Sequence, residues 1–199
     1  MTKRSLFIIT PTFAGGGAEH IAVSLANYYV SINYTVYVIC ELVEGPFASQ
    51  LGSSVIVRET KTRSLIKNIF SLKKLIFEEQ PEICISTVRR SNVIAGFASY
   101  FTFKKHKFIS LEVNTLDTFY KRSFHSRLLW KMMMQISYRK FQKIVACSEV
   151  VKTQVMKLLW LNDSQITVIG NPVLPQNYLS LAKEDAEFWP IEFKNSHDV

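Results

Sequence analysis

Three consecutive glycines, Gly15, Gly16 and Gly17, separate a short apolar run from a helix-like segment near the start of the chain. Successive glycines let backbone N–H groups turn toward an anion, and the amino end of a helix adds partial positive charge. The pattern favours binding of a phosphate or a sugar over a turn without a ligand. The dinucleotide fingerprint would require glycine or alanine where His20 stands, although Glu41 could serve as its ribose-binding acid. An NAD-type site stays open as an alternative.

The cysteines and histidines show no spacing that is typical of a metal site or of a nucleophilic triad. Each cysteine falls inside an apolar run, which predicts a thiol that is buried like a small hydrophobic side chain. An odd number of such thiols is simplest to explain in a reducing cytoplasm. We expect no metal at the cysteines Cys40, Cys84 and Cys147 or at the histidines His20, His106, His125 and His197.

Short apolar runs alternate with helix-like segments along the chain. The runs are apolar throughout rather than at every second residue, which indicates strands that are covered on both faces. Strand–helix–strand repeats predict an α/β, Rossmann-like fold with a mostly parallel sheet of about six or seven strands and helices on both faces. The expected strands are 5–10, 35–42, 55–57, 82–88, 107–113, 143–147 and 165–169, and the expected helices are 18–31, 64–79, 91–101, 123–141 and 149–159.

The composition is that of a globular protein, because 48% of the 199 residues are hydrophobic and 20% are charged. It excludes an intrinsically disordered chain and a disulfide scaffold. The net charge of +8 favours an anionic partner, such as a phosphorylated ligand, an acidic membrane surface or nucleic acid. The first apolar run stops at Pro11 and no run of about 18 apolar residues follows, so neither a signal peptide nor a spanning helix is predicted.

Three separated segments carry a family resemblance. They are 15–19 with the sequence GGGAE, 144–149 with IVACSE, and 166–173 with ITVIGNPV. As an ordered set they resemble the amino-terminal, acceptor-binding domain of GT-B-type glycosyltransferases of family 4 (group 1 glycosyltransferases). Their order and spacing match a Rossmann-like domain over about residues 5–175.

The resemblance implies a transferase that moves a sugar from a nucleotide-diphosphate sugar to a glycan or lipid-linked acceptor, with retained anomeric configuration. It requires no cofactor beyond this donor substrate. In the family, the amino-terminal domain chiefly binds the acceptor, and the glycine loop lies by the donor phosphates across the cleft. Gly15, Gly16 and Gly17 are therefore the donor-phosphate candidates, because N–H donors can stabilise the charge that develops on the leaving diphosphate. No catalytic residue is assigned.

Polar side chains near the predicted strand ends become candidates for acceptor binding. The segment 108–114 resembles a strand end that reads S-E-H-N or S-E-R-N in relatives, and Val113 replaces the basic residue. Each candidate has a structural alternative: Glu112 as a charge exposed at a strand end, Ser148 as a helix cap, and the residues after the fourth strand as a solvated loop. The acceptor-binding candidates are Glu19, His20, Arg89, Asn92, Glu112, Asn114 and Ser148.

The sequence ends where the resemblance places a second, donor-binding domain. We therefore expect a Rossmann-like glycosyltransferase domain at 1–175, a linker or terminal extension at 176–199, and no donor-binding domain in this sequence. Such a chain is a truncated gene product, an excised domain or one subunit of a split transferase. Its activity as an enzyme would then depend on a donor-domain partner chain.

No acidic residue lies between Asp117 and Glu149, and apolar side chains alternate with the basic ones there. Such a segment can lie on an anionic membrane surface, where each basic residue contributes about 1 kcal/mol. The alternative is an apolar core side with a solvated charged face. Membrane contact would suit a lipid-linked acceptor, with the protein cytoplasmic and peripheral on the inner face of the plasma membrane. The membrane-surface candidates are Lys121, Arg122, Arg127 and Lys131.

These patterns favour the acceptor-binding half of a glycosyltransferase of surface polysaccharide biosynthesis, such as that of a capsule or another cell-envelope glycan. Two alternatives belong to other classes. The basic stretch also fits a non-catalytic, membrane-associated partner subunit, and the glycine loop with Glu41 fits a small NAD(P)-binding oxidoreductase. No nucleic-acid recognition module is visible, so nucleic acid is not an expected partner.

Overall fold

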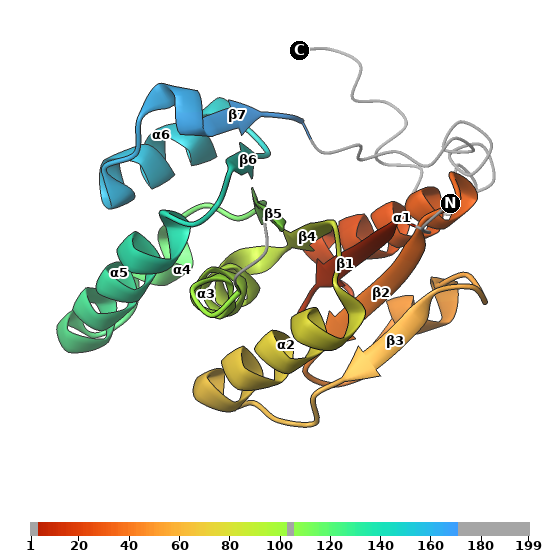
Figure 1. Ribbon diagram of the computed structural model, residues 1–199. Coiled ribbons are helices and arrows are strands. Elements are labelled where there is room, and N and C mark those ends of the chain that lie inside the picture. The colour runs from red at the N-terminus through yellow and green to blue at the C-terminus, as the bar shows by residue number, and fades with distance from the viewer. Residues whose placement is uncertain (1–3, 103–105, 171–199) are drawn as a thin grey trace, which may run out of the picture.

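The computed structural model describes residues 4–102 and 106–170, which contain one sheet of seven strands (Figure 1). All neighbouring strands in these ranges pair in parallel. The α/β, Rossmann-like sheet predicted from the apolar runs is confirmed. The strands are β1 (Ser5–Ile9), β2 (Thr35–Cys40), β3 (Ile56–Glu59), β4 (Ile83–Ser86), β5 (Lys107–Glu112), β6 (Lys143–Ala146) and β7 (Ile166–Val168).

Each expected helix is present, with ends that differ from expectation by at most three residues. The largest changes are at the start of the helix after β4, which begins at Val88 rather than Ser91, and at the end of α5, which is Tyr138 rather than Phe141. One four-residue helix and two 3-10 helices were not predicted, because elements this short carry no periodic pattern. The helices are α1 (Gly17–Ser31), η1 (Pro46–Gln50), α2 (Leu65–Glu79), α3 (Val88–Ser99), α4 (Asp117–Tyr120), α5 (Phe124–Tyr138), α6 (Glu149–Leu159) and η2 (Asp163–Gln165).

The strand order is β3-β2-β1-β4-β5-β6-β7. The chain builds outward from β1 to β3, crosses back to β4 on the other side of β1, and then continues outward to β7. The connections after β1 and β4 therefore leave in opposite directions, which makes their carboxyl ends a topological switch point. Ligands of open α/β sheets bind in the crevice at such a point.

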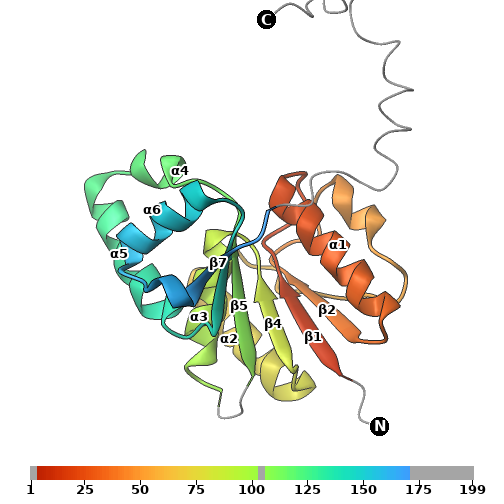
Figure 2. The ribbon, with the colours of Figure 1, turned by 90° about the horizontal axis from the view of Figure 1, so that it is seen from above.

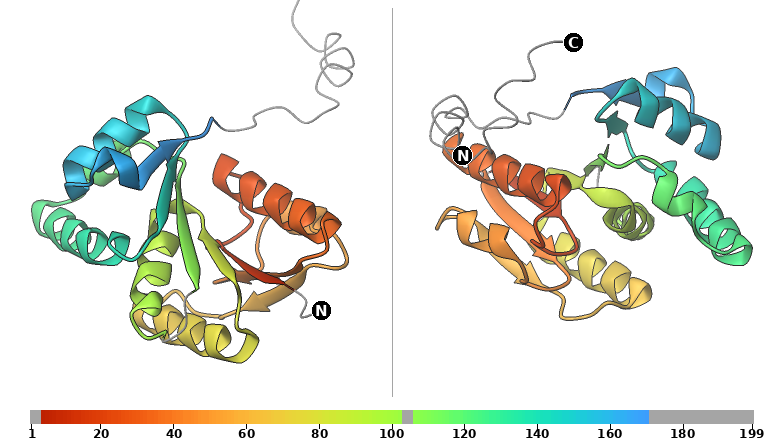
Figure 3. Two further views of the ribbon diagram at one scale, coloured as in Figure 1. Left: turned by 45° about the horizontal axis from the view of Figure 1, so that its top comes forward. Right: turned by 180° about the vertical axis from the view of Figure 1, so that it is seen from behind.

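Helices cover both faces of the sheet, as predicted (Figures 2 and 3). On one face, α1 and η1 pack over β1 and β2, and on the other face the apolar residues of α2, α3, α5 and α6 form the larger core cluster. Successive strand side chains point to opposite faces. Leu6 and Ile8 accordingly contact the α1 side, while Phe7 and Ile9 contact the other side. Both faces are buried, which explains why β1 is apolar at nearly every position.

Cys40 and Cys84 are buried free thiols, as predicted, and Cys147 is partly buried. Burial raises the pKa of Cys40 to about 12 and also raises the pKa of Cys84. Since the thiolate is the nucleophilic form, these two side chains serve as core residues. Within the described residues no helix is both long and apolar enough to cross a bilayer. The predicted extension at 176–199 lies outside the described residues.

Candidate functional site

The glycine loop joins β1 to α1 at the switch point. Gly15 has a φ of 103°, a left-handed conformation that glycine adopts without the steric cost of a Cβ atom. Gly16 is the N-cap of α1 and makes no side-chain cap. The first N–H groups of a helix have no intrahelical partner, so these donors point toward the crevice without a capping side chain. The loop has the geometry of an anion-binding helix terminus.

Glu19 lies in the first turn of α1, beside the glycine loop. A Cβ atom placed on Gly16 would be 2.5 Å from Oε2 of Glu19, which shows how close this carboxylate is to the helix end. A carboxylate is stabilised there by the helix dipole, as a bound anion would be. Glu19 therefore lies directly beside the amino end of α1.

A second loop, which the sequence analysis missed, supports the glycine loop. The fully buried Phe13 donates its N–H to the Glu44 carbonyl at 2.7 Å and accepts from the Phe47 N–H at 3.3 Å. Gly45 has a φ of 115°, and a Cβ atom there would lie 2.0 Å from the Phe13 oxygen, so the loop requires glycine. The His20 ring packs edge-on against Phe47 with centroids 5.4 Å apart. The only sequence pattern that marked this loop was a glycine followed by proline.

The turn between β4 and α3 forms the other side of the switch point. The Thr87 N–H donates to the Ile9 carbonyl at 2.9 Å, which ties this turn to the end of β1. Val88 has a φ of 52°, a conformation that costs a β-branched residue about 1–2 kcal/mol. Backbone strain of this kind collects at functional sites. No sequence pattern marked this residue, because the helix was expected to begin later.

Arg89 extends from the start of α3 to the loop after β5. Its Nη2 donates to the carbonyls of Asn114 at 3.1 Å and Thr115 at 3.2 Å, and lies 3.7 Å from Oε2 of Glu112. The side chain is only 15% exposed, and its Nε is buried without a hydrogen-bond partner. The alternative of a solvated loop is therefore wrong for Arg89, which fixes the β5 loop against α3.

Glu112 is 1% exposed, so the alternative of a charge exposed at a strand end is also wrong. Its Oε1 accepts from Asn92 Nδ2 at 2.7 Å and from the Tyr138 hydroxyl. Asn92 Oδ1 in turn accepts from Ser86 at 2.7 Å. Burial raises the pKa of Glu112, while Arg89, Tyr138 and Asn92 act in the opposite direction. This network joins β4, β5, α3 and α5 beneath the crevice, and it holds Asn92 and Glu112 inside the protein.

Glu41, at the end of β2, is paired with Arg90. Arg90 Nε donates to Oε1 of Glu41 at 2.6 Å, and a second nitrogen of Arg90 donates to the Arg63 carbonyl. Glu41 is buried, with 8% of its surface exposed. The carboxylate that an NAD-type site would use for a ribose is thus engaged by a guanidinium group.

Two candidates lie at the far side of the crevice. Ser148 Oγ accepts from the Val151 N–H at 3.3 Å. Ser148 therefore caps α6, which is the structural role given above as the alternative to acceptor binding. The Asn114 side chain is exposed at the end of β5, and its carbonyl holds Arg89. Asn114 is therefore the one acceptor candidate that is exposed, whereas the other candidates, all within the described residues, are buried or partly buried.

An apolar cavity of about 420 Å³ lies between α1 and the strands β4 to β6. Its walls include Ile109 and Leu111 of β5, which are only partly buried, and it reaches His20 and Val113 at the carboxyl end of the sheet. Val113 adds a further apolar side chain to this wall. Of the predicted acceptor candidates, His20 lines the cavity.

The membrane-surface candidates lie around α5, apart from the glycine loop. Lys121 is exposed. Arg122 stacks over Trp130 at 5.0 Å from the ring centroid, Arg127 over Phe124 at 5.9 Å, and Lys131 over Trp160 at 5.0 Å. The structure thus brings together the glycine loop, Glu19 and His20 on one side of the crevice, with the Arg89–Glu112 group on the other. In the part of the chain that the structure describes, no three His, Cys, Asp or Glu side chains are placed to hold a metal.

Comparison with known families gives one match, to Glycosyltransferase Family 4 over residues 15–176. The match spans the glycine loop and the six strands from β2 to β7, and it includes the candidates named above. None of the curated protein sequences matches the chain closely enough to add a relative.

Several solved structures share this fold. A glycosyltransferase from Rickettsia africae ESF-5 superposes with a TM-score of 0.66 at 18% identity, over 96% of this chain and 51% of the other. Anabaena Alr3699/HepE in complex with UDP-glucose gives 0.66 at 14% identity, over 90% and 49%. The lipopolysaccharide outer core galactosyltransferase WaaB in its apo form gives 0.59 at 17% identity, over 86% and 46%. The chain spans about half the length of each.

Proposed function

The chain belongs to glycosyltransferase family 4, and from this premise we propose that it forms the acceptor-binding half of a retaining transferase of surface polysaccharide biosynthesis. The transferase moves a sugar from a nucleotide-diphosphate sugar to a glycan or lipid-linked acceptor and requires no other cofactor. Residues 1–175 form the acceptor-binding domain and 176–199 a linker. The donor-binding domain is supplied by further sequence or by a partner chain.

The observation that carries this proposal is the exposed glycine loop at the uncapped start of α1, placed at the switch point of the sheet. When the glycosidic bond of the donor breaks, negative charge develops on the leaving diphosphate. Fixed N–H donors stabilise that charge without reorganising. Gly15, Gly16 and Gly17 leave room for the diphosphate, and Glu19 moves aside when it binds.

The acceptor lies across the crevice, between α1 and the ends of β4, β5 and β6. The apolar cavity suits a lipid-like or otherwise apolar part of the acceptor. Its sugar hydroxyls bind polar groups at the rim, among which His20 and Asn114 are the most direct candidates. Arg89, Asn92 and Glu112 position the β5 loop that presents Asn114, and Ser148 positions the start of α6.

A substitution at Gly17 tests the diphosphate site. No atom lies within 4 Å of a Cβ at this position, and an acidic residue at a helix start favours the helix. Gly17→Asp should therefore preserve the fold but repel the diphosphate, lowering its affinity about tenfold or more. Gly17→Asn is the neutral control of the same size. Saturation-transfer NMR measures UDP binding by the two variants. Equal UDP binding by Gly17→Asp and Gly17→Asn contradicts the proposed site.

A transfer assay tests whether the chain is half of an enzyme. The chain is incubated with labelled nucleotide sugars and lipid or glycan acceptors, alone and with the product of any adjacent gene. We expect transfer only when a donor-binding domain is added. Turnover by the isolated chain contradicts the half-enzyme proposal.

A second candidate is a non-catalytic subunit that recruits a transferase to the membrane. It rests on α5, where aromatic and aliphatic side chains are exposed beside Arg122, Arg127 and Lys131. In both candidates the protein is cytoplasmic and peripheral on the inner face of the plasma membrane. Restored transfer on adding a donor domain supports the first candidate, and membrane recruitment of a complete transferase supports the second.

A further inference from the structure

The amphipathic helix α2 carries two apolar stripes, and only one of them is buried. The inner stripe packs into the core, as its sequence spacing predicts. The outer stripe consists of Ile66, Phe70 and Phe77, which are 66%, 53% and 79% exposed. These residues are four and seven positions apart, so they lie in one line along the helix. Large apolar side chains aligned on an exposed helix face mark an interaction site.

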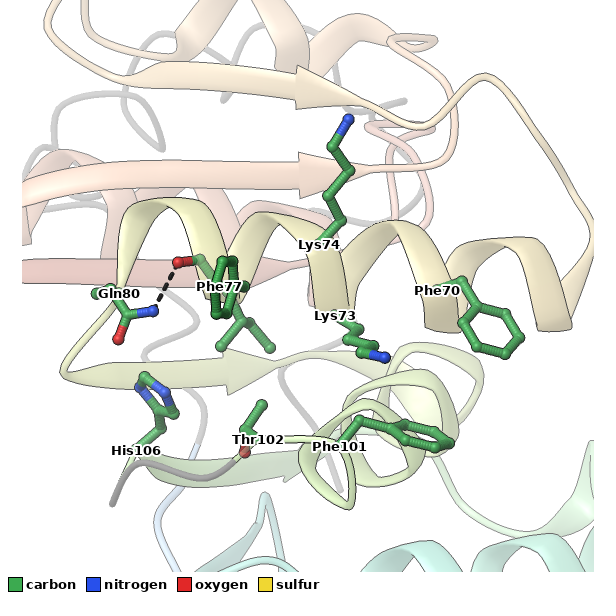
Figure 4. A pocket seen from close by; sticks show the side chains of 9 residues that line it. Phe70, Lys73, Lys74, Phe77, Gln80, Phe101, Thr102 and His106 are labelled. Carbon is green, nitrogen blue, oxygen red and sulfur yellow. Dashed lines mark hydrogen bonds between the residues drawn. The ribbon is translucent and has the colours of Figure 1, made fainter.

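Phe101, two residues after the end of α3, extends this outer stripe (Figure 4). The ring centroids of Phe70 and Phe101 are 6.0 Å apart, and Phe101 is itself 44% exposed. Lys73 Nζ lies 5.1 Å from the centroid of the Phe101 ring. A hollow of about 520 Å³ opens between α2 and the residues that follow α3, and Phe77 and Lys74 also line it. We call Ile66, Phe70, Lys73, Lys74, Phe77 and Phe101 the α2 face.

Helix α3 lies between α2 and α5 and contacts both of them, so the α2 face and α5 are separated by α3 alone (Figures 1 and 3). The Tyr100 hydroxyl donates to the Ile136 carbonyl at 3.0 Å, and Lys140 Nζ lies 4.2 Å from the Tyr100 ring centroid. The exposed residues Phe124, Leu128, Met132 and Ile136 form a line along α5 with a spacing of four.

The charges on this side of the molecule are predominantly basic. On α2, the exposed Lys67 and Lys74 and the half-buried Lys73 stand beside the outer stripe, and Glu78 is paired with Lys74 at 3.7 Å. Helix α5 contains no acidic residue. Lysine side chains can rest their apolar stems on such a surface while the ammonium groups reach outward.

We propose that the α2 face docks on an anionic phospholipid bilayer, with the aromatic rings at the acyl boundary and the lysines at the phosphates. Aligned apolar residues flanked by lysines are the chemistry of an interfacial helix. The α2 face and α1 lie on opposite sides of the sheet, so docking leaves the glycine loop uncovered. The inference rests on the proposed function only in the purpose given to docking, which is to hold the crevice near a lipid-linked acceptor.

Vesicle flotation with the full 199-residue chain tests the docking directly. Vesicles of phosphatidylcholine with one-third phosphatidylglycerol are compared with phosphatidylcholine alone at moderate salt. We expect Phe70→Ser with Phe77→Ser to weaken binding about tenfold or more. Lys73→Gln with Lys74→Gln should weaken binding to the anionic vesicles by about fivefold per lysine and leave the weak binding to neutral vesicles unchanged.

The controls are exposed residues elsewhere. Ile32→Ser lies at the end of α1 and is 44% exposed, and Lys143→Gln changes a charge on β6. We expect both to bind anionic vesicles like the unchanged chain. Equal binding by the α2 variants and the controls overturns the proposal, as does equal binding of the unchanged chain to both vesicle types. Loss of binding in Arg127→Gln with Lys131→Gln, but not in the α2 variants, assigns the contact to α5 alone and also overturns it.

A spectroscopic variant separates docking from misfolding. Phe77→Trp places an indole at the most exposed position of the stripe, and the difference from the unchanged chain isolates its emission. A blue shift on anionic vesicles is expected, and no shift overturns the proposal. These measurements use no sugar donor, so a failure of docking is distinguishable from a failure of the proposed transfer reaction.

Discussion

Asn92 and Glu112 meet inside the protein, with Nδ2 of the amide 2.7 Å from Oε1 of the carboxylate. Asn92 is 0% exposed and Glu112 is 1% exposed. They lie at the base of the crevice, where they join α3 to the end of β5. The contact converts two candidate ligand-binding residues into a support for the loop that carries Asn114.

Replacing the buried amide should destabilise the protein. Asn92→Ala removes partners of Ser86 and Glu112 and leaves buried polar atoms unsatisfied, which costs about 1–3 kcal/mol in the free energy of unfolding. Urea denaturation measures the loss. Asn114→Ala, at an exposed position on the adjoining loop, should change it by less than about 0.5 kcal/mol. Equal stability of the two variants would contradict the network.

The stability contributed by Glu112 should depend on pH. Burial raises its pKa above the ordinary value of 4.5, so the folded protein holds this proton more tightly than the unfolded chain does. This contribution is present below pH 4.5 and is lost as the pH rises toward the raised pKa, with a slope of up to about 1.4 kcal/mol per pH unit. In Glu112→Gln the slope is absent. The stability of the variant relative to the unchanged protein should therefore rise with pH, and a constant or falling difference would refute the assignment.

Gly45 should tolerate no side chain. Gly45→Ala places a methyl group 2.0 Å from the Phe13 carbonyl oxygen at a φ of 115°, and should lower the free energy of unfolding by more than about 2 kcal/mol. Gly17→Ala is the matched control, since no atom lies within 4 Å of its Cβ and the change should cost less than about 0.5 kcal/mol. Thermal denaturation monitored by circular dichroism compares them, and similar midpoints would exclude the close approach at Gly45.

Relieving the strained turn should stabilise the fold. Asparagine adopts left-handed conformations more readily than valine, so Val88→Asn should raise the free energy of unfolding by about 1 kcal/mol. Val150→Asn, in the exposed and regular first turn of α6, should give no gain. If the strain also orients Arg89, transfer by the completed enzyme should fall in Val88→Asn although stability rises. Loss of stability in Val88→Asn would show that the turn is unstrained.

Most of the secondary structure could be predicted from local patterns. Buried strands such as β1 are continuous apolar runs, and α6 is delimited by its Ser148 cap and its apolar spacing. Burial of Cys40 and Cys84 also follows from the runs that contain them. The inner stripe of α2 was recognised from its spacing, but its outer stripe was not, because exposure depends on which neighbouring helices cover each side.

Local patterns were enough to predict the order of strands and helices and the glycine loop at the first strand–helix junction, because each is encoded within a few adjacent residues. The alternation of these elements along the chain predicted the parallel sheet. The contacts between distant segments became visible in the three-dimensional structure. Asn92, Glu112 and Tyr138 lie on three elements, and Gly45 is distant in sequence from the loop that it supports. Such contacts depend on strand order and helix packing, which local periodicity does not encode. The packing of the helices against the sheet buries Glu112 and leaves Phe77 exposed.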